Sequence, residues 1–386
     1  MKTKPKIAIY SGEIPSTTFI ERLILGLSNN GYEILLFGQI KKNITYNQSV
    51  LNKGYKSGKL QKAVYLIYYS VLLMLFRNKD KRKLDQILKS RSNVRLYDKV
   101  KCYPVLWHKP DVFHIQWAKG LEDWIWVQEF GIKIIQSLRG AHINYSPIAD
   151  PVLASMYKTY FPKVDDFHAV SKAIGVEAEK YGASKEKITV VYSGLQFEER
   201  ITRKKQNKIF QIISIGRPHW IKGYTYALDA CKLLKDQGFQ FHYTIVGGTG
   251  DIEFAYQVHD LDITNEVSLT NQRPFKQVQE LIQEADLLVL PSVKEGIANV
   301  VLEAMSLNTM VLTTDCGGVS EVIKNGENGF IIPIRDSKKM ADKIIDIANI
   351  SQEKEDFITT NALKTIKKQH SEQQMVEAMI ELYQKV

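Results

Sequence analysis

The stretch DLLVLPSVKEGIANVVLEAM, residues 286–305, holds the elements that decide the fold. Residues 286–290 are almost continuously apolar, which is typical of a strand buried on both faces of a parallel sheet. Small residues form a turn after it, and residues 299–306 carry the apolar period of a helix. A buried strand that passes through a short turn into a helix is the repeating unit of a Rossmann-like fold.

The same alternation extends through both halves of the chain. In the C-terminal half we expect strands at 210–215, 239–246, 267–269, 286–290, 310–313 and 330–333. Its expected helices are 224–236, 275–285, 299–306, 319–324 and a long helical tail over 337–385. In the N-terminal half we expect a helix at 17–30 and strands at 6–10, 32–37, 112–115, 133–138, 166–170 and 188–191.

This pattern predicts the α/β class, with two Rossmann-like domains whose parallel sheets face a central cleft. We expect residues 1–197 to form an acceptor-side domain and residues 209–369 a donor domain, joined by the polar linker 198–208. Residues 370–386 are expected to return to the N-terminal domain. A chain of 386 residues with 44% hydrophobic content is long enough for two cores. That content excludes disordered and collagen-like classes.

The cysteines and the N-terminus point to the cytoplasm. Cys102, Cys231 and Cys316 are odd in number and far apart, which indicates neither a disulfide framework nor a zinc site. The apolar run near the N-terminus is only one strand long, so no signal peptide is expected.

The net charge of +10 is concentrated in residues 41–101, which hold 16 Lys or Arg and 3 acidic residues. The remaining chain has 36 basic and 39 acidic residues, or −3. Inside this segment, residues 63–76 are uncharged and flanked by basic residues; the run is shorter than the roughly 20 residues that span a bilayer. Two interpretations remain: a core helix, or a helix lying on the inner, anionic face of the cytoplasmic membrane; both hold if only one face of the helix is buried. Nucleic acid is not expected as a partner, because no binding module is recognisable.

The turn before residue 299 predicts a diphosphate site. Backbone N–H groups of Ala298, Asn299 and Val300 at a helix start favour an anion, with Gly296 and Ile297 completing the turn. Glu295 and Glu303 are separated by roughly 12 Å along the helix axis. Because a nucleotide-diphospho-sugar carries its sugar and its ribose on opposite sides of the diphosphate, one carboxylate suits each end.

These residues resemble the family 4 retaining glycosyltransferases of the GT-B superfamily. Residues 295–305, E-G-x-x-N-x-x-x-E-A-M, are similar to the family's E-x7-E signature, and Gly216-Arg217 followed by Lys222-Gly223 resembles its G-R-x4-K-G element. The resemblance implies that Arg217 and Lys222 neutralise the diphosphate of a UDP- or GDP-sugar and that Glu295 belongs to the catalytic centre. It implies no metal and no cofactor besides the donor.

The N-terminal half resembles the amylovoran and colanic-acid branch, which builds bacterial surface polysaccharide. The loop that contains Gly12 is similar to a donor-side element of that branch, and DVFHIQW, residues 111–117, resembles its D-V-x-H-x-H strand end. His114, Gln116 and Trp117 are therefore acceptor-side candidates. Gln116 replaces the second histidine and cannot accept a proton as imidazole does, so His142 becomes the alternative catalytic candidate.

The resemblance implies transfer with retention onto a lipid-linked glycan in O-antigen, capsule or exopolysaccharide synthesis. Two alternatives stay open: a GT-B sugar-nucleotide epimerase, and a catalytically silent, membrane-associated scaffold with the same fold. NAD chemistry is disfavoured, because residues 247–250 lack a full G-x-G-x-x-G after the first strand.

Overall fold

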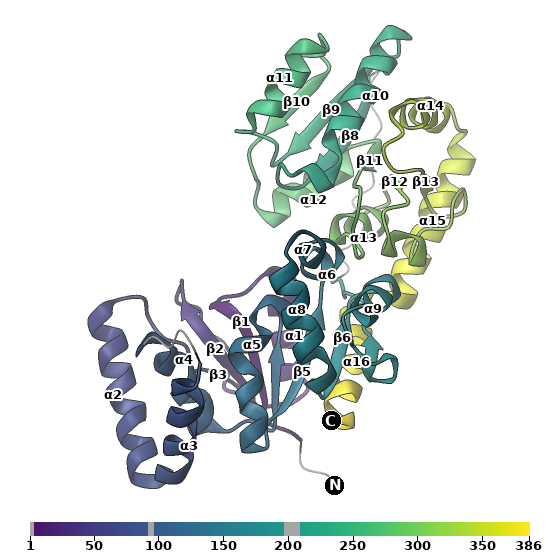
Figure 1. The fold of residues 1–386 in the computed structure, drawn as a ribbon. Coiled ribbons are helices and arrows are strands. Elements are labelled where there is room, and N and C mark those ends of the chain that lie inside the picture. The colour runs from purple at the N-terminus through teal and green to yellow at the C-terminus, as the bar shows by residue number, and fades with distance from the viewer. Residues whose placement is uncertain (1–3, 92–95, 197–208) are drawn as a thin grey trace. The chain divides into compact units, whose positions relative to one another are not determined.

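The computed structural model describes residues 4–91, 96–196 and 209–386, and it divides the chain into two compact units (Figure 1). Unit 1 comprises Met1–Gly194 and Glu372–Val386, and unit 2 comprises Leu195–Ser371. The expected linker, 198–208, lies outside the described residues.

Unit 1 contains a seven-stranded sheet of order β3-β2-β1-β4-β5-β6-β7 in which neighbouring strands are parallel. Its strands are β1 Ile7–Ile14, β2 Ile34–Ile40, β3 Val50–Asn52, β4 Val112–Ile115, β5 Lys133–Leu138, β6 Asp166–Ala169 and β7 Ile188–Val190. Its α-helices are α1 Thr18–Asn29, α2 Lys59–Phe76, α3 Asn78–Lys89, α4 Leu96–His108, α5 Leu121–Trp124, α6 Gly140–Asn144, α7 Ser146–Ala149, α8 Pro151–Tyr160, α9 Lys172–Glu179 and α16 Glu372–Lys385. Short 3₁₀ turns are η1 Ala118–Gly120, η2 Ile125–Phe130, η3 Phe161–Lys163 and η4 Lys185–Lys187.

Unit 2 contains a six-stranded parallel sheet of order β10-β9-β8-β11-β12-β13. Its strands are β8 Phe210–Ile215, β9 Phe241–Val246, β10 Val267–Thr270, β11 Leu287–Leu290, β12 Met310–Thr314 and β13 Phe330–Ile332. Its helices are α10 Tyr224–Asp236, α11 Ile252–Asp260, α12 Phe275–Glu284, α13 Asn299–Ser306, α14 Ser337–Ala348 and α15 Gln352–Gln369, with 3₁₀ turns η5 Trp220–Lys222 and η6 Gly318–Glu321.

Both sheets are covered on both faces, as continuous apolar strands require. In β11, Leu287 and Val289 join one buried cluster, whereas Leu288 and Leu290 join another on the opposite face. In β1, Ile7 and Ile9 likewise join one buried cluster, whereas Ala8 joins another on the opposite face of the sheet. The prediction of an α/β protein with two parallel sheets is confirmed.

The C-terminal tail differs from the continuous helix that we expected over 337–385. It breaks into α14, α15 and α16, because Ser351 leaves the helical conformation and its hydroxyl accepts a hydrogen bond from the N–H of Lys354, 3.3 Å away. His370 interrupts the backbone again before α16. The helix expected at 319–324 is the 3₁₀ turn η6.

The last helix, α16, packs on α1 in unit 1. Gly26 makes this approach possible, since a Cβ atom there would lie 2.3 Å from Cγ2 of Val376. Met379, Leu382 and Tyr383 extend the same buried cluster. The helix therefore completes one covering layer of the unit 1 sheet.

Candidate functional site

Lys222 and Glu295 form an ion pair at the carboxyl ends of two neighbouring strands in unit 2. Lys222 ends η5, after β8, and Glu295 follows β11. Lys222 Nζ lies 2.6 Å from Glu295 Oε1, which also accepts a 3.2 Å hydrogen bond from the hydroxyl of Ser292. Their side chains are 22% and 17% exposed, so the pair remains accessible to a ligand.

The loop before α10 is fixed against the loop after β11 by backbone contacts. The N–H of Val293 donates to the carbonyl of Ile221 at 2.7 Å. Gly223 has φ +67°, and a Cβ atom there would lie 2.0 Å from the carbonyl oxygen of Pro291. Glycine is therefore required beside Lys222 for both conformation and space.

A third loop, after β12, holds Glu295 from its other side. The N–H of Glu295 donates to the carbonyl of Cys316 at 2.6 Å. Gly317 has φ +123°, and a Cβ atom there would lie 2.5 Å from the carbonyl oxygen of Glu295. The hydroxyl of Thr314 donates to the carbonyl of Ser292. The position of Glu295 is thus set by backbone from three loops.

Positive charge gathers on the loop between β8 and η5. Gly216 packs against Tyr224, whose hydroxyl would lie 2.8 Å from an added Cβ, and Arg217 next to it is exposed. Burial first, and then the charges of Arg217 and Lys222, lower the pKa of His219. Lys222 is paired with Glu295, so the exposed Arg217 is the cation of this loop that is available to attract an anion. Sequence reasoning missed His219, although it lies inside the element that contains Arg217 and Lys222.

Helix α13 begins where the sequence predicted. Ala298 precedes it in an extended conformation, and no side chain among the described residues caps it. Gly296 and Ala298 are buried, whereas Ile297, Asn299 and Glu303 are partly exposed. The predicted donor-binding residues of this segment therefore lie on the turn that follows Glu295 and on the helix α13 that continues it.

The unit 1 candidates lie at the carboxyl ends of β1, β4 and β5. Gly12 has φ +87° at a bulge in β1, and the indole N–H of Trp117 donates to the carbonyl of Ser11 at 3.1 Å. The rings of Trp117 and His142 are 5.4 Å apart. Burial first, with a contribution from Lys119, lowers the pKa of His142 to about 4. His142 is therefore neutral near pH 7.

His114 and Gln116 are completely buried. Both ring nitrogens of His114 are hydrogen-bonded, Nδ1 to the Tyr383 hydroxyl at 2.7 Å and Nε2 to the Ser137 hydroxyl at 2.8 Å. His114 is thus engaged within the core through both ring nitrogens, and neither nitrogen is left for a ligand. Gln116 accepts a 3.0 Å hydrogen bond from Arg139 Nη2.

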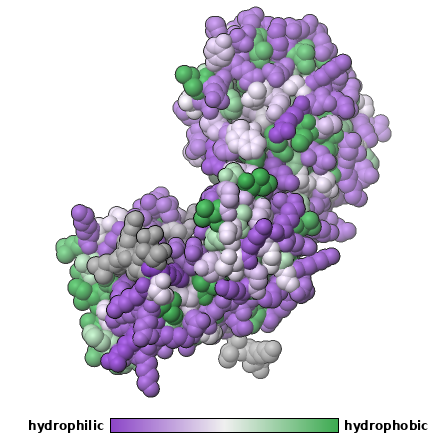
Figure 2. All heavy atoms as spheres, viewed as in Figure 1, coloured by the Kyte–Doolittle hydropathy of each residue, from purple (hydrophilic) through white to green (hydrophobic). Residues whose placement is uncertain are grey.

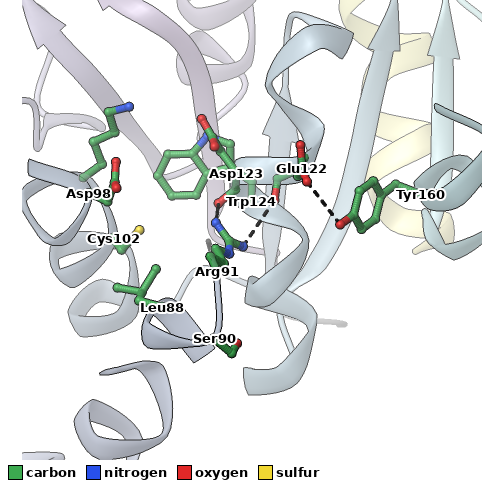
Figure 3. Close-up of a pocket in the computed structure, with 10 residues that line it drawn as sticks. Leu88, Ser90, Arg91, Asp98, Cys102, Glu122, Asp123, Trp124 and Tyr160 are labelled. Carbon is green, nitrogen blue, oxygen red and sulfur yellow. Dashed lines mark hydrogen bonds between the residues drawn. The ribbon is translucent and has the colours of Figure 1, made fainter. Parts of the chain in front are cut away.

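A separate cavity of about 520 Å³ lies in unit 1 between α3, α4, α5 and α8 (Figure 3). The guanidinium of Arg91 donates to the carbonyls of Asp123 and Glu122 at its wall. None of its lining residues is a predicted site residue.

The described residues contain no group of three or more His, Cys, Asp or Glu side chains that could hold a metal ion. Glu295 is engaged with a lysine instead.

Part of the chain matches a known protein family. Residues 196–365 match the family described as "Glycosyl transferases group 1". The chain is 24% identical, over 60% of its length and 59% of the relative's, to the putative colanic acid biosynthesis glycosyltransferase WcaL of Salmonella typhimurium. It is 25% identical, over 61% of its length and 65% of the relative's, to the N,N'-diacetylbacillosaminyl-diphospho-undecaprenol alpha-1,3-N-acetylgalactosaminyltransferase of Campylobacter jejuni. The chain thus spans less than two thirds of either relative.

The fold also has a solved counterpart. The Anabaena protein HepE, in complex with UDP-glucose, superposes with a TM-score of 0.72 at 15% identity, covering 99% of this chain and all of that one. The expected GT-B fold is confirmed.

Proposed function

We propose that the chain is a retaining, metal-independent hexosyltransferase of bacterial surface polysaccharide synthesis, because residues 196–365 match the group 1 glycosyl transferases and the fold is GT-B. It transfers a sugar from a UDP- or GDP-sugar to a lipid-linked glycan. The observation that carries the proposal is the Lys222–Glu295 pair, held at the carboxyl ends of parallel strands beside the start of α13. Ligands of open α/β sheets bind at this edge.

Unit 2 supplies the donor contacts. The N–H groups that begin α13 face the diphosphate, and Arg217 and Lys222 neutralise it. Glu303 accepts hydrogen bonds from the ribose hydroxyls, while Glu295 contacts the transferred sugar. Lys222 then exchanges its contact with Glu295 for the phosphate oxygens, which places Glu295 and Lys222 on adjacent parts of one donor.

The chemistry consists of charge stabilisation and orientation. The bond from the anomeric carbon to the diphosphate oxygen breaks, and the acceptor hydroxyl oxygen bonds the same carbon from the same face. The acceptor proton goes to the departing phosphate oxygen. Since negative charge grows on the leaving group, fixed cations stabilise the transition state without an added metal or cofactor.

The donor can be tested by thermal unfolding of the full chain with UDP, GDP and their sugars. We expect one nucleotide series to raise the melting temperature; a ligand at 100 times its Kd stabilises by about 2.7 kcal/mol. Glu303→Ala should remove most of this rise, whereas Glu280→Ala, an exposed glutamate on α12, should keep it. Absence of a response to every nucleotide would overturn the transferase proposal.

A lipid-linked acceptor is supported by the exposed apolar face of α2. Of its 18 residues, Tyr69 and Leu73 are buried, against α4 and the unit 1 core. The outer face exposes more than half of each of its large side chains Leu60, Val64, Ile67, Tyr68, Met74, Leu75 and Phe76. Figure 2 shows hydrophobic residues gathered where Figure 1 places α2.

This face suits the interface of an anionic membrane. α2 is the one helix in the described part of the chain that is long and apolar enough to cross a membrane. Because α2 packs against α4 of unit 1, it is held on the surface of that unit. This packing favours a helix that lies in the membrane–water interface over one that spans the bilayer. The surrounding segment, 41–101, has a net charge of +13, which complements anionic head groups. We place the protein at the cytoplasmic face of the membrane on this ground.

Vesicle co-sedimentation tests the membrane contact. Binding is expected for phosphatidylglycerol vesicles, to weaken with salt, and to be absent for phosphatidylcholine. Val64→Glu with Leu75→Glu should reduce the bound fraction at least about 10-fold, because each removes an apolar side chain worth roughly 1.5–3 kcal/mol when buried. Val176→Glu, equally exposed on α9, is the matched control. Binding that ignores lipid charge, or a concentration-dependent dimer lost in the double variant, would show a different occupant.

A further inference from the structure

Arg139 carries a positive charge that no carboxylate balances in the described part of the chain. It lies between β5 and α6, is partly buried, and has a fully buried Nε without a hydrogen-bond partner. Its guanidinium stacks on Phe19, 4.5 Å from the ring centroid, and its Nη2 donates to the side-chain oxygen of Gln116. A desolvated cation with only neutral partners is costly to maintain.

Gln116 presents a second unused donor beside it. Its side chain is 0% exposed, its oxygen is taken by Arg139, and its Nε2 has no partner. Buried donors in native proteins are almost always paired with an acceptor. Two unpaired donors on side chains that are hydrogen-bonded to each other therefore indicate a missing acceptor. Burial lowers the pKa of Arg139 to about 9, which still leaves it cationic near pH 7.

The surroundings place these donors at the ligand-binding edge of unit 1. Gln116 follows β4 and Arg139 follows β5, so both lie at carboxyl ends of neighbouring parallel strands. Trp117 is adjacent, with its ring 6.2 Å from Phe19 and 5.4 Å from His142. An aromatic ring next to a cation suits a sugar that carries an acidic group.

We propose that Arg139 and Gln116 form an oxyanion subsite that binds a phosphate or carboxylate of the acceptor, Arg139 through Nε–H and Gln116 through Nε2–H. The assignment to the acceptor rests on the proposed function; the oxyanion chemistry rests on the two side chains alone. Both side chains of the subsite belong to unit 1, whereas Lys222 belongs to unit 2.

Calorimetric titration of the full chain with inorganic pyrophosphate separates the two sites. We expect two binding events, one lost in Lys222→Gln and the other weakened at least 10-fold in Arg139→Gln. Lys133→Gln removes the same charge at the opposite end of β5 and should retain both. A single event that is lost in Lys222→Gln but kept in Arg139→Gln would overturn this inference and leave the donor site intact. A single event lost only in Arg139→Gln would support it and count against the donor site.

A second arm uses D-glucuronate to identify the source of the oxyanion. Pyrophosphate binding without glucuronate binding indicates a phosphorylated acceptor, and the reverse indicates an acidic sugar. Arg139→Lys keeps the charge but loses the planar donor pair, so it should weaken the event less than Arg139→Gln and also keeps the test usable if Arg139→Gln fails to fold. Binding of neither ligand at this site would overturn the proposal.

Discussion

Lys222→Ala is expected to lower kcat about 100- to 1000-fold, the range seen when one preorganised group is removed from a developing oxyanion. In the structure Lys222 Nζ is already fixed, 2.6 Å from Glu295, on a loop locked by the Gly223–Pro291 contact. A cation held in place costs little reorganisation when the leaving diphosphate gains charge. Release of nucleoside diphosphate from the donor found by the thermal screen measures the effect.

The control is a lysine with similar ion pairs elsewhere in unit 2. Lys235 contacts Asp262 at 3.2 Å and Glu266 at 3.5 Å, remote from the carboxyl ends of the strands. Lys235→Ala should keep kcat within about twofold of wild type. Glu295→Gln should separate the two roles of the pair, because it removes the charge of Glu295 and leaves Lys222 in place. Wild-type turnover in Lys222→Ala would remove the lysine from the catalytic centre.

The sequence predicts the strands and the donor loops well, because both depend on local patterns. Alternating and continuous apolar runs identify β8 and β11, and glycines mark the turns that must follow them. Placing these turns at the same sheet edge brings Lys222 and Glu295 together, although they are 73 residues apart. The contact of Gly223 with Pro291 was not predictable, since it depends on the final separation of two loops.

The role of His114 could not be predicted, because it depends on a partner 269 residues away. A histidine near the end of a strand fits a ligand site or a core equally well by sequence. Tyr383 of α16 decides between them by occupying Nδ1. Likewise, the composition of residues 63–76 allowed either a core helix or an interfacial one, and only the packing on α4 identifies the covered face.

Lowering the pH from 7 to 5 is expected to destabilise unit 1 by about 4 kcal/mol through its two most deeply buried histidines alone, because the fold holds both neutral. His114 is 0% and His168 is 4% exposed. Burial first, then the neighbouring His168 and Arg139, holds the pKa of His114 well below its usual value. Burial first, then Arg139, lowers the pKa of His168 to about 3.

The hydrogen bonds fix which protons are present. Nε2 of His168 must donate to the carbonyl of Val191, 3.1 Å away, so its Nδ1 accepts from Ser137. The Ser137 oxygen then accepts from Nε2 of His114, whose Nδ1 accepts from Tyr383. Each group in this chain is satisfied only when both imidazoles are neutral. A proton added to either ring forces the neighbouring hydroxyl of Tyr383 or Ser137 to turn away, and that hydroxyl then loses its own acceptor.

The direction of the pH dependence follows from how many protons the folded and the unfolded protein bind. Unfolded histidines take up protons below pH about 6.5, while the folded ones do not until the pH is far lower, so stability falls as the pH falls. At pH 5 each of the two histidines lowers the free energy of unfolding by about 2 kcal/mol. This pH is about 1.5 units below the pKa of an unfolded histidine, and each unit is worth about 1.36 kcal/mol. Most carboxylates are still ionised there, so the histidines dominate this window.

Denaturant unfolding followed by tryptophan fluorescence measures this loss, because Trp107, Trp117, Trp124 and Trp126 lie in unit 1 and only Trp220 in unit 2. His168→Gln should remove about 2 kcal/mol of the pH-dependent loss, since an amide can donate to Val191 and accept from Ser137 without titrating. His259→Gln, at an exposed position of α11, should leave it unchanged. Equal unfolding free energies at pH 7 and pH 5 would mean that these histidines are not held neutral by the fold, and the core role of His114 would have to be abandoned.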